Sequence, residues 1–176
     1  MSEENHASQR NGCAAVSANG AALPAGDDTT RHERNELLLR ARLRLSEYSY
    51  EHTMEQLLQK TLDEAELLTG GTIGFFHFIE KDEKAVSLQC WSTRTRREMC
   101  KVAPFEKHYA IDRAGVWVDC VRERKPVIHN DYPNLPHRHG LPEGHAPILR
   151  ELTVPVFRQG RVVAILGTGN KPAPYD

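Results

Sequence analysis

The stretch LTVPVFRQGRVVAILGTGNK, residues 152–171, decides the fold class of this 176-residue chain. Two apolar runs, 152–157 and 161–166, flank a short Gln159-Gly160 turn, and this pattern predicts a β-hairpin. Pro155 has no backbone N–H, so its strand should carry a bulge or lack one ladder hydrogen bond at that point. The hairpin therefore indicates antiparallel sheet in the C-terminal part of the sequence.

Further strands are expected upstream of the hairpin. Residues 73–79 (IGFFHFI) are rich in β-formers and apolar on both faces, which predicts a central strand. Residues 86–91 alternate between apolar and polar side chains, which predicts a strand with one face on a core or pocket. Residues 108–111 and 126–129 are two shorter candidates. Consecutive antiparallel strands with helices between them indicate an α+β fold whose sheet is covered on both faces.

Helices are expected around this sheet. Thr53 and Gln56 form a capping box at the start of a helix that Gly70-Gly71 should end. An earlier stripe of leucines predicts a helix over 31–47, too short to be an independent coiled coil. Its partner is either its own domain or the same helix of a second copy. A later helix over 114–124 would be capped by Asp112.

Composition excludes several classes of protein. The 23 Lys and Arg against 24 Asp and Glu give a net charge of −1, without the positive field that nucleic-acid binding needs. The longest aliphatic run, VVAIL at 162–166, is far shorter than the roughly 20 residues of a membrane span. Four cysteines without a C-x-x-C pair indicate the reducing cytoplasm rather than a disulfide framework.

The chain divides into three parts by composition. Residues 1–30 carry few large apolar side chains and are expected to be a disordered tail. Residues 31–50 are expected to form an N-terminal signalling or dimerisation helix. Residues 51–176 hold the strands and are expected to form the domain.

The sequence resembles a GAF domain over residues 34–176. The motifs that carry the resemblance are the final hairpin and the stretches IGFFHF (73–78), LQCWSTRT (88–95), GVWVDC (115–120), KPVIHNDY (125–132) and LPEGHAP (141–147). The resemblance implies a six-stranded antiparallel sheet with the terminal helices on one face and a pocket under residues 91–149 on the other. The C-terminal helix usual in the family is missing or truncated here, which is expected of a fragment of a larger sensor.

The resemblance also implies which residues border the pocket, and these are Trp91, His108, Tyr109, Trp117, His129, Asn130 and His145. The two tryptophans either stack on a ligand or serve as ordinary core aromatics. Each histidine either orients a polar ligand or is a hydrogen-bonded structural residue. The basic run at 94–101 either holds an anion or is a solvated edge. The sequence identifies no catalytic residue and leaves any cofactor unknown.

A possible metal site is a cluster of metal-ligating residue types within 17 positions: His129, Asp131, His137, His139 and His145. Imidazole and carboxylate together are good ligands for zinc or ferrous iron. However, His137 and His139 fall in a Pro-rich loop without an expected helix or strand to fix ligand geometry. No metal or haem site is therefore expected.

The function expected from the resemblance is that of a sensory GAF domain, of the subgroup found beside PAS, histidine-kinase and diguanylate-cyclase (GGDEF) domains in bacterial two-component and related sensors. Its partners would be an unidentified small-molecule ligand, a second copy of the chain and a downstream output domain. The alternative is a thiol enzyme similar to the free methionine-R-sulfoxide reductases, using Cys90 and Cys100. That family has cysteine where this sequence has Trp117, so no enzyme activity is expected of this chain.

Overall fold

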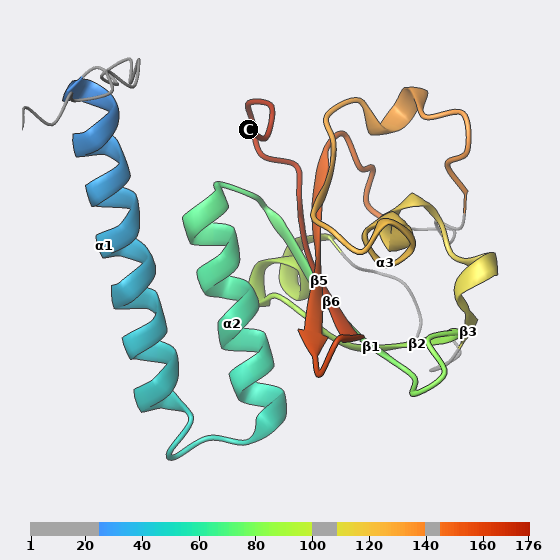
Figure 1. The fold of residues 1–176 in the computed structure, drawn as a ribbon, viewed down its shortest axis with the longest axis horizontal. Helices are drawn as coiled ribbons and strands as arrows, with labels where there is room; N and C mark the ends of the chain where they lie inside the picture. Colours follow the sequence, from blue (N-terminus) through green and yellow to red (C-terminus); the bar gives the residue numbers. More distant parts are fainter. Residues whose placement is uncertain (1–24, 100–108, 140–144) are drawn as a thin grey trace, which may run out of the picture.

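A computed structural model describes residues 25–99, 109–139 and 145–176. It contains a six-stranded sheet in the order β3-β2-β1-β6-β5-β4, in which all neighbouring strands are antiparallel. The expected α+β architecture is confirmed (Figure 1). The strands are β1 (Ile73–Ile79), β2 (Ala85–Trp91), β3 (Tyr109–Ala110), β4 (Val127–His129), β5 (Glu151–Arg158) and β6 (Arg161–Gly169).

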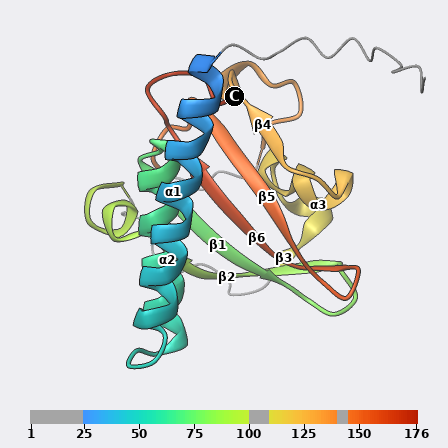
Figure 2. The same ribbon diagram turned by 60° about the vertical axis from the view of Figure 1, so that its left-hand side comes forward.

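Two long helices cover one face of the sheet, and a short helix with irregular turns covers the other (Figure 1). Helix α2 (Met54–Thr69) packs on β1, β2 and β6, and α1 (Ala25–Tyr48) runs along the outer side of α2 (Figure 2). Helix α3 (Asp119–Glu123) lies on the opposite face. No helix among the described residues is long and apolar enough to cross a bilayer.

The boundaries of α2 follow from its capping chemistry. The Thr53 hydroxyl accepts a hydrogen bond from the Gln56 backbone N–H, and the Gln56 side chain accepts one from the Thr53 N–H. This confirms the expected capping box, which satisfies N–H groups that have no partner within the helix. At the other end Gly70 adopts φ +74°, and its N–H bonds to the Glu66 carbonyl at 2.8 Å. Gly70 thus ends the helix in the left-handed conformation that glycine favours.

A β-bulge in the β1–β2 ladder determines which side chains face which layer. Phe76 pairs with Cys90, but His77 pairs with Leu88, so Gln89 is an extra residue on β2. Side chains after the bulge therefore change face relative to simple alternation. Cys90 joins the core beneath α2, whereas Trp91 packs with the core on the opposite face.

The helix expected over 114–124 is wrong in its extent. The backbone at Ala114 and Gly115 is extended, and only a 3-10 turn, Val116–Val118, and then α3 follow. A side chain at Gly115 would place its Cβ 2.2 Å from the carbonyl oxygen of His139, so the loop at His139 runs directly against this extended backbone. Asp112 lies in a separate 3-10 turn, Ile111–Arg113, and does not cap a helix.

The start of α1 and the position of the bulge in β5 also need comment. Helix α1 begins at Ala25, so residues 25–30 are helical rather than part of a disordered tail. Apolar periodicity could not place this start, because a helix extends over polar residues once its paired part has formed. At Pro155 the sequence left two alternatives, a bulge or a missing ladder hydrogen bond, and the register shift lies further along, between Val156 and Phe157. Pro155 itself lies beyond the end of β4, in a part of β5 that has a strand on one side only.

A close approach between β1 and β6 shapes the face opposite α2. Phe75 pairs with Gly167, and its ring lies directly over the Gly167 backbone, where an added Cβ would stand 2.1 Å from Phe75 Cζ. The Gly167-Thr168-Gly169 stretch therefore has a packing role, because only a residue without a side chain leaves room for the ring.

We predict that Gly167→Ala lowers the free energy of unfolding by about 1–3 kcal/mol, because the Phe75 ring must leave its position. Urea unfolding followed by circular dichroism measures the effect. In a Phe75→Leu background the same substitution should cost less, since the ring has gone. A Gly167→Ala protein as stable as the parent would contradict this packing.

Candidate functional site

Aromatic side chains from four segments converge on the sheet face opposite α2. The Phe75 ring makes edge contacts with Trp91 of β2 and with Trp117 of the Val116–Val118 turn, at centroid distances of 6.3 and 6.0 Å. The His77 ring stacks on Trp117 at 4.3 Å. His145, in the loop before β5, approaches Trp91 edge-on at a centroid distance of 5.9 Å. Phe75, His77, Trp91, Trp117 and His145 are called the aromatic group below.

Members of the aromatic group differ in their exposure to solvent. Trp117 is only 8% exposed and packs within the core, whereas Trp91 and His145 are half-buried. His77 is buried on β1, and desolvation lowers its pKa to about 3, so it is neutral at physiological pH. The half-buried pair Trp91 and His145 is therefore the part of the group within reach of a ligand.

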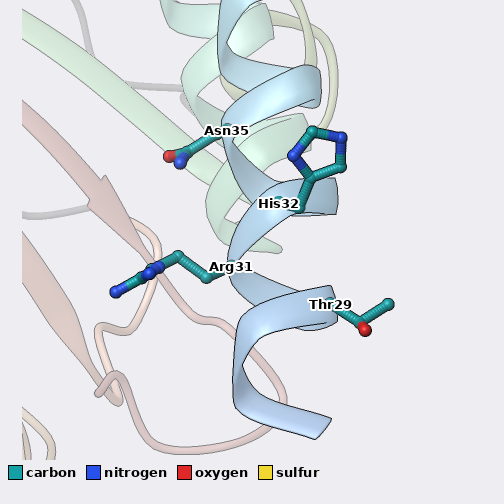
Figure 3. Close-up of a pocket in the computed structure, with 4 residues that line it drawn as sticks. All are labelled: Thr29, Arg31, His32 and Asn35. Carbon is teal, nitrogen blue, oxygen red and sulfur yellow. The ribbon is translucent and has the colours of Figure 1, made fainter. Parts of the chain in front are cut away.

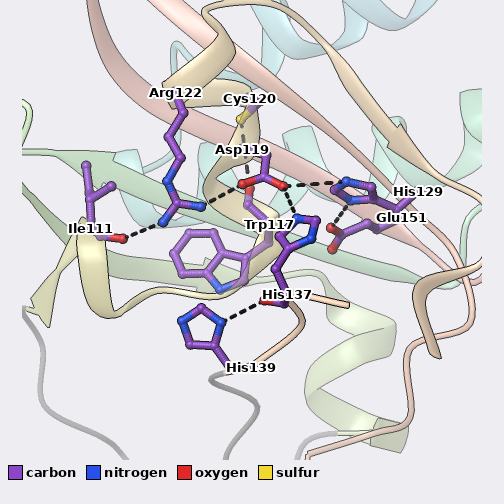
Figure 4. Close-up of polar contacts among 9 residues, drawn as sticks. All are labelled: Ile111, Trp117, Asp119, Cys120, Arg122, His129, His137, His139 and Glu151. Atoms are coloured by element: carbon purple, nitrogen blue, oxygen red, sulfur yellow. Dashed lines mark hydrogen bonds and ion pairs between the residues drawn. The ribbon is translucent and has the colours of Figure 1, made fainter. Parts of the chain in front are cut away.

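A polar cluster lies beside the aromatic group on the same face of the sheet (Figure 4). His129 of β4 pairs with Glu151 of β5 across the ladder, so their side chains stand side by side. His129 Nδ1–H donates to Glu151 Oε1 at 2.8 Å. This bond raises the pKa of His129, while burial raises the pKa of Glu151.

Asp119, the first residue of α3, ties this pair to the loop. Its Oδ2 lies 3.6 Å from His129 Nε2 and accepts a hydrogen bond from His137 Nε2 at 3.1 Å. Its Oδ1 accepts from Arg122 Nη1 at 2.6 Å, and Arg122 Nη2 donates to the Ile111 carbonyl. The two Asp119 oxygens therefore have different partners: Oδ1 pairs with Arg122, and Oδ2 faces the imidazoles of His129 and His137 (Figure 4).

The structure separates the residues that the sequence assigned to one pocket. Trp91, Trp117 and His145 belong to the aromatic group, and His129 belongs to the polar cluster. Tyr109 lies in β3, and its side chain is outside what the structure describes, as is all of His108. Asn130 makes a different contact: its side chain bonds the N–H of Tyr175 at 2.7 Å and the carbonyl at 3.0 Å.

Asn130 thus anchors the C-terminal segment. Tyr175 is 6% exposed, and its hydroxyl lies 3.5 Å from Thr168 Oγ1 of β6. The chain after β6 therefore folds back against the sheet edge as an irregular segment. This is a structural role for Asn130 rather than contact with the aromatic group.

Sequence reasoning missed His77, Asp119 and Glu151. His77 is the one polar residue in the run IGFFHFI, and a polar side chain within an apolar strand is a signal that could have identified it. Asp119 stands among apolar residues in VWVDCV and could have been identified in the same way. Asp131, weighed as a metal ligand, instead accepts hydrogen bonds from Asn134.

The two described cysteines are poorly suited to thiol chemistry. Cys90 and Cys120 are both buried, and burial raises the pKa of each thiol to about 11. Catalytic thiols need a lowered pKa and access to substrate. Cys90 also faces α2, away from the aromatic group. Cys100, the proposed partner of Cys90 in the enzyme alternative, lies outside the described residues.

A surface hollow also lies beside the first turns of α1. It is lined by Thr29, Arg31, His32 and Asn35, all of which come from that one helix. Figure 3 shows Arg31 and Asn35 pointing to one side of the helix and Thr29 and His32 to the other. Side chains that diverge from a single helix cannot enclose a ligand, so this hollow is not the candidate site.

Comparison with known proteins places the domain in a family. Residues 51–176 match the sequence profile of the GAF domain, and the chain belongs to this family. The chain is 34% identical over 125 residues, or 70% of its length, to the methyl sulfide methyltransferase-associated sensor of Methanosarcina acetivorans. It spans only 12% of the length of that protein.

Solved structures agree on the fold. The GAF domain of a phosphoenolpyruvate-protein phosphotransferase from Coxiella burnetii matches with a TM-score of 0.60 and 15% identity, over 78% of this chain and 79% of that one. The free methionine-R-sulfoxide reductase of Neisseria meningitidis, solved with its substrate, matches with a TM-score of 0.56 and 15% identity, over 78% of this chain and 73% of that one. At this identity the likeness establishes a shared fold and nothing about shared chemistry.

We predict that Cys90 and Cys120 are inert in the folded protein. In a Cys13→Ser/Cys100→Ser variant at about pH 8, only roughly one in a thousand of the remaining thiols should be ionised, and these thiols are buried. The folded variant should therefore react very slowly with DTNB. The release of thionitrobenzoate measures the reaction, and the same variant unfolded in guanidinium should react at both thiols. Rapid reaction of either thiol in the folded protein would contradict the burial described here.

Proposed function

We propose that this chain is a sensory GAF domain that binds a small molecule at the aromatic group and passes the event to α1. The observation that carries the proposal is the convergence of Trp91 and His145 on the sheet face opposite α2. An aromatic surface with few polar groups is typical of small-molecule sites. The sensor role of the Methanosarcina acetivorans relative supports the same function.

The relay would run through β1. Phe75 and His77 of β1 belong to the aromatic group, while Phe76 on the other face packs with Leu62 of α2. A ligand that prefers one arrangement of the aromatic group would therefore bias the packing of α2. An output domain in the same polypeptide, of the histidine-kinase or diguanylate-cyclase kind, would then receive the signal in the cytoplasm.

Helix α1 packs on α2 and lies outside the layer that contacts the sheet. Among residues 29–48 of α1, whose burial the structure describes, Ala41 is the buried one, at 2% exposure. Beyond it, Arg44 forms a two-pronged ion pair with Glu64, with Nε–Oε1 and Nη2–Oε2 distances of 3.0 and 2.6 Å. The contact lowers the pKa of Glu64, so the ion pair is weakened as the pH falls and Glu64 becomes protonated.

Leucines on the rest of α1 support a homodimer. Leu39 and Leu43, one helical turn apart, are 63% and 60% exposed. Leu37 and Leu38 are also exposed. These leucines lie on a helix that already packs on α2. Burying them against a second helix is more favourable than leaving them exposed to water.

The reductase alternative draws support from the shared fold with the Neisseria meningitidis enzyme. Against it stand the raised pKa values of Cys90 and Cys120 and the orientation of Cys90 toward α2. We therefore propose a binding function rather than thiol catalysis.

The binding proposal is tested by thermal unfolding of the chain against a library of small metabolites. Compounds that raise the Tm of the parent protein should lose that effect in Trp91→Ala, because the exposed part of the aromatic group has gone. Tyr50→Ala, which removes an 85% exposed aromatic ring in the turn after α1, should respond like the parent. If Trp91→Ala kept the full response to every active compound, the site would lie elsewhere.

The dimer proposal makes a separate prediction. The parent chain should elute as a dimer in size-exclusion chromatography with light scattering, and Leu43→Glu should elute as a monomer because a carboxylate cannot be buried between helices without a partner. Leu149→Glu is the matched control, since Leu149 is 52% exposed in the loop before β5. A monomeric parent, or a dimer that survives Leu43→Glu, would contradict the role given to α1.

A further inference from the structure

Three ligand atoms in the polar cluster point toward a common centre. They are Asp119 Oδ2, an imidazole nitrogen of His129 and an imidazole nitrogen of His137, and all three lie within 4.8 Å of one another. The Asp119 oxygen lies 3.1 Å from His137 Nε2 and 3.6 Å from His129 Nε2. Atoms bound to one transition-metal ion at about 2.1 Å stand roughly 3.0–3.5 Å apart, so both separations from Asp119 Oδ2 are close to those of a bound ion. The two imidazole nitrogens lie within 4.8 Å of each other, and a turn of the exposed His137 side chain would adjust that separation.

The surrounding residues orient these ligands as an outer shell does in metal proteins. Glu151 accepts the Nδ1–H of His129, which directs the lone pair of Nε2 toward Asp119. A carboxylate behind a ligating histidine is the usual device for fixing its tautomer and ring orientation. Arg122 occupies Oδ1 of Asp119 and leaves Oδ2 for the centre.

Two of the three ligands lie on a helix or a strand rather than in the Pro-rich loop. Asp119 begins α3 and His129 ends β4, so two of the three ligands lie on packed elements. Only His137 comes from the Pro-rich loop. The sequence offered His129 and His137 as candidate ligands but not Asp119, and Asp119 Oδ2 is the atom near which both imidazoles lie.

Charge and access also favour a cation here. With neutral imidazoles, the cluster holds two carboxylates, Asp119 and Glu151, against the single guanidinium of Arg122, which leaves one net negative charge (2 − 1). The His137 side chain is 54% exposed, so the centre can be reached from solvent, whereas the His129 side chain is 11% exposed and fixed.

We propose that Asp119, His129 and His137 bind a divalent first-row transition-metal ion of the Zn²⁺ or Fe²⁺ type. Two imidazoles and one carboxylate form a ligand set suited to these ions, and such a set leaves coordination positions for water or a further ligand. The site is distinct from the proposed contact of a small molecule with Trp91 and His145, and it does not depend on that proposal.

The test is isothermal titration of the full chain with ZnCl₂ after chelator treatment and removal of the chelator. We expect one Zn²⁺ per chain and a higher Tm in its presence. His137→Ala and Asp119→Asn should each weaken Zn²⁺ binding at least tenfold. His137 is exposed, so its variant should fold normally, and circular dichroism and the metal-free Tm verify this.

The matched control is His139→Ala, two residues along the same loop. His139 Nδ1–H donates to the His137 carbonyl, and its ring does not belong to the ligand set. Its Zn²⁺ affinity should stay within about threefold of the parent. The proposal is overturned if the parent binds no Zn²⁺ saturably, if His137→Ala binds as tightly as the parent, or if His139→Ala loses as much affinity as His137→Ala.

Discussion

The single extra residue in β2 is the constraint on which the arrangement of the two sheet faces depends. Because Gln89 is unpaired in the ladder, Trp91 turns to the face of Phe75 and Cys90 turns toward α2. Simple alternation would exchange them, placing a thiol beside the aromatic group and an indole beneath the helix. The bulge therefore places the Trp91 indole, rather than the Cys90 thiol, on the face of Phe75 and Trp117.

The sheet separates the aromatic group and the polar cluster on one face from the packed helices on the other. On one face, irregular segments bring the aromatic group and the polar cluster together; on the other, α2 and α1 are stacked in two layers (Figure 2). The two faces share β1, whose successive side chains alternate between them. A change at Phe75 or His77 thus lies one residue from the packing of Phe76 on Leu62 of α2, and the proposed relay rests on this proximity.

Local chemistry predicted most of the fold and little of the site. The capping box at Thr53, the apolar run of β1 and the final hairpin are each written within a few neighbouring residues, so the sequence alone indicates them. The bulge at Gln89 follows from pairing between strands and leaves no local pattern. The Asp119–His129–Glu151 contact joins α3, β4 and β5, and the sequence does not show that these three residues meet, because the β4–β5 ladder is what places His129 opposite Glu151.

The proposed binding face for small molecules carries both tryptophans of the chain. Fluorine NMR of protein labelled with 5-fluorotryptophan tests it most directly, because Trp91 and Trp117 supply the only two signals. Trp91→Phe and Trp117→Phe assign them. Each compound that stabilises the domain should shift the Trp91 signal, with a smaller change at the buried Trp117. Compounds that stabilise the domain and leave both signals unmoved would contradict the account.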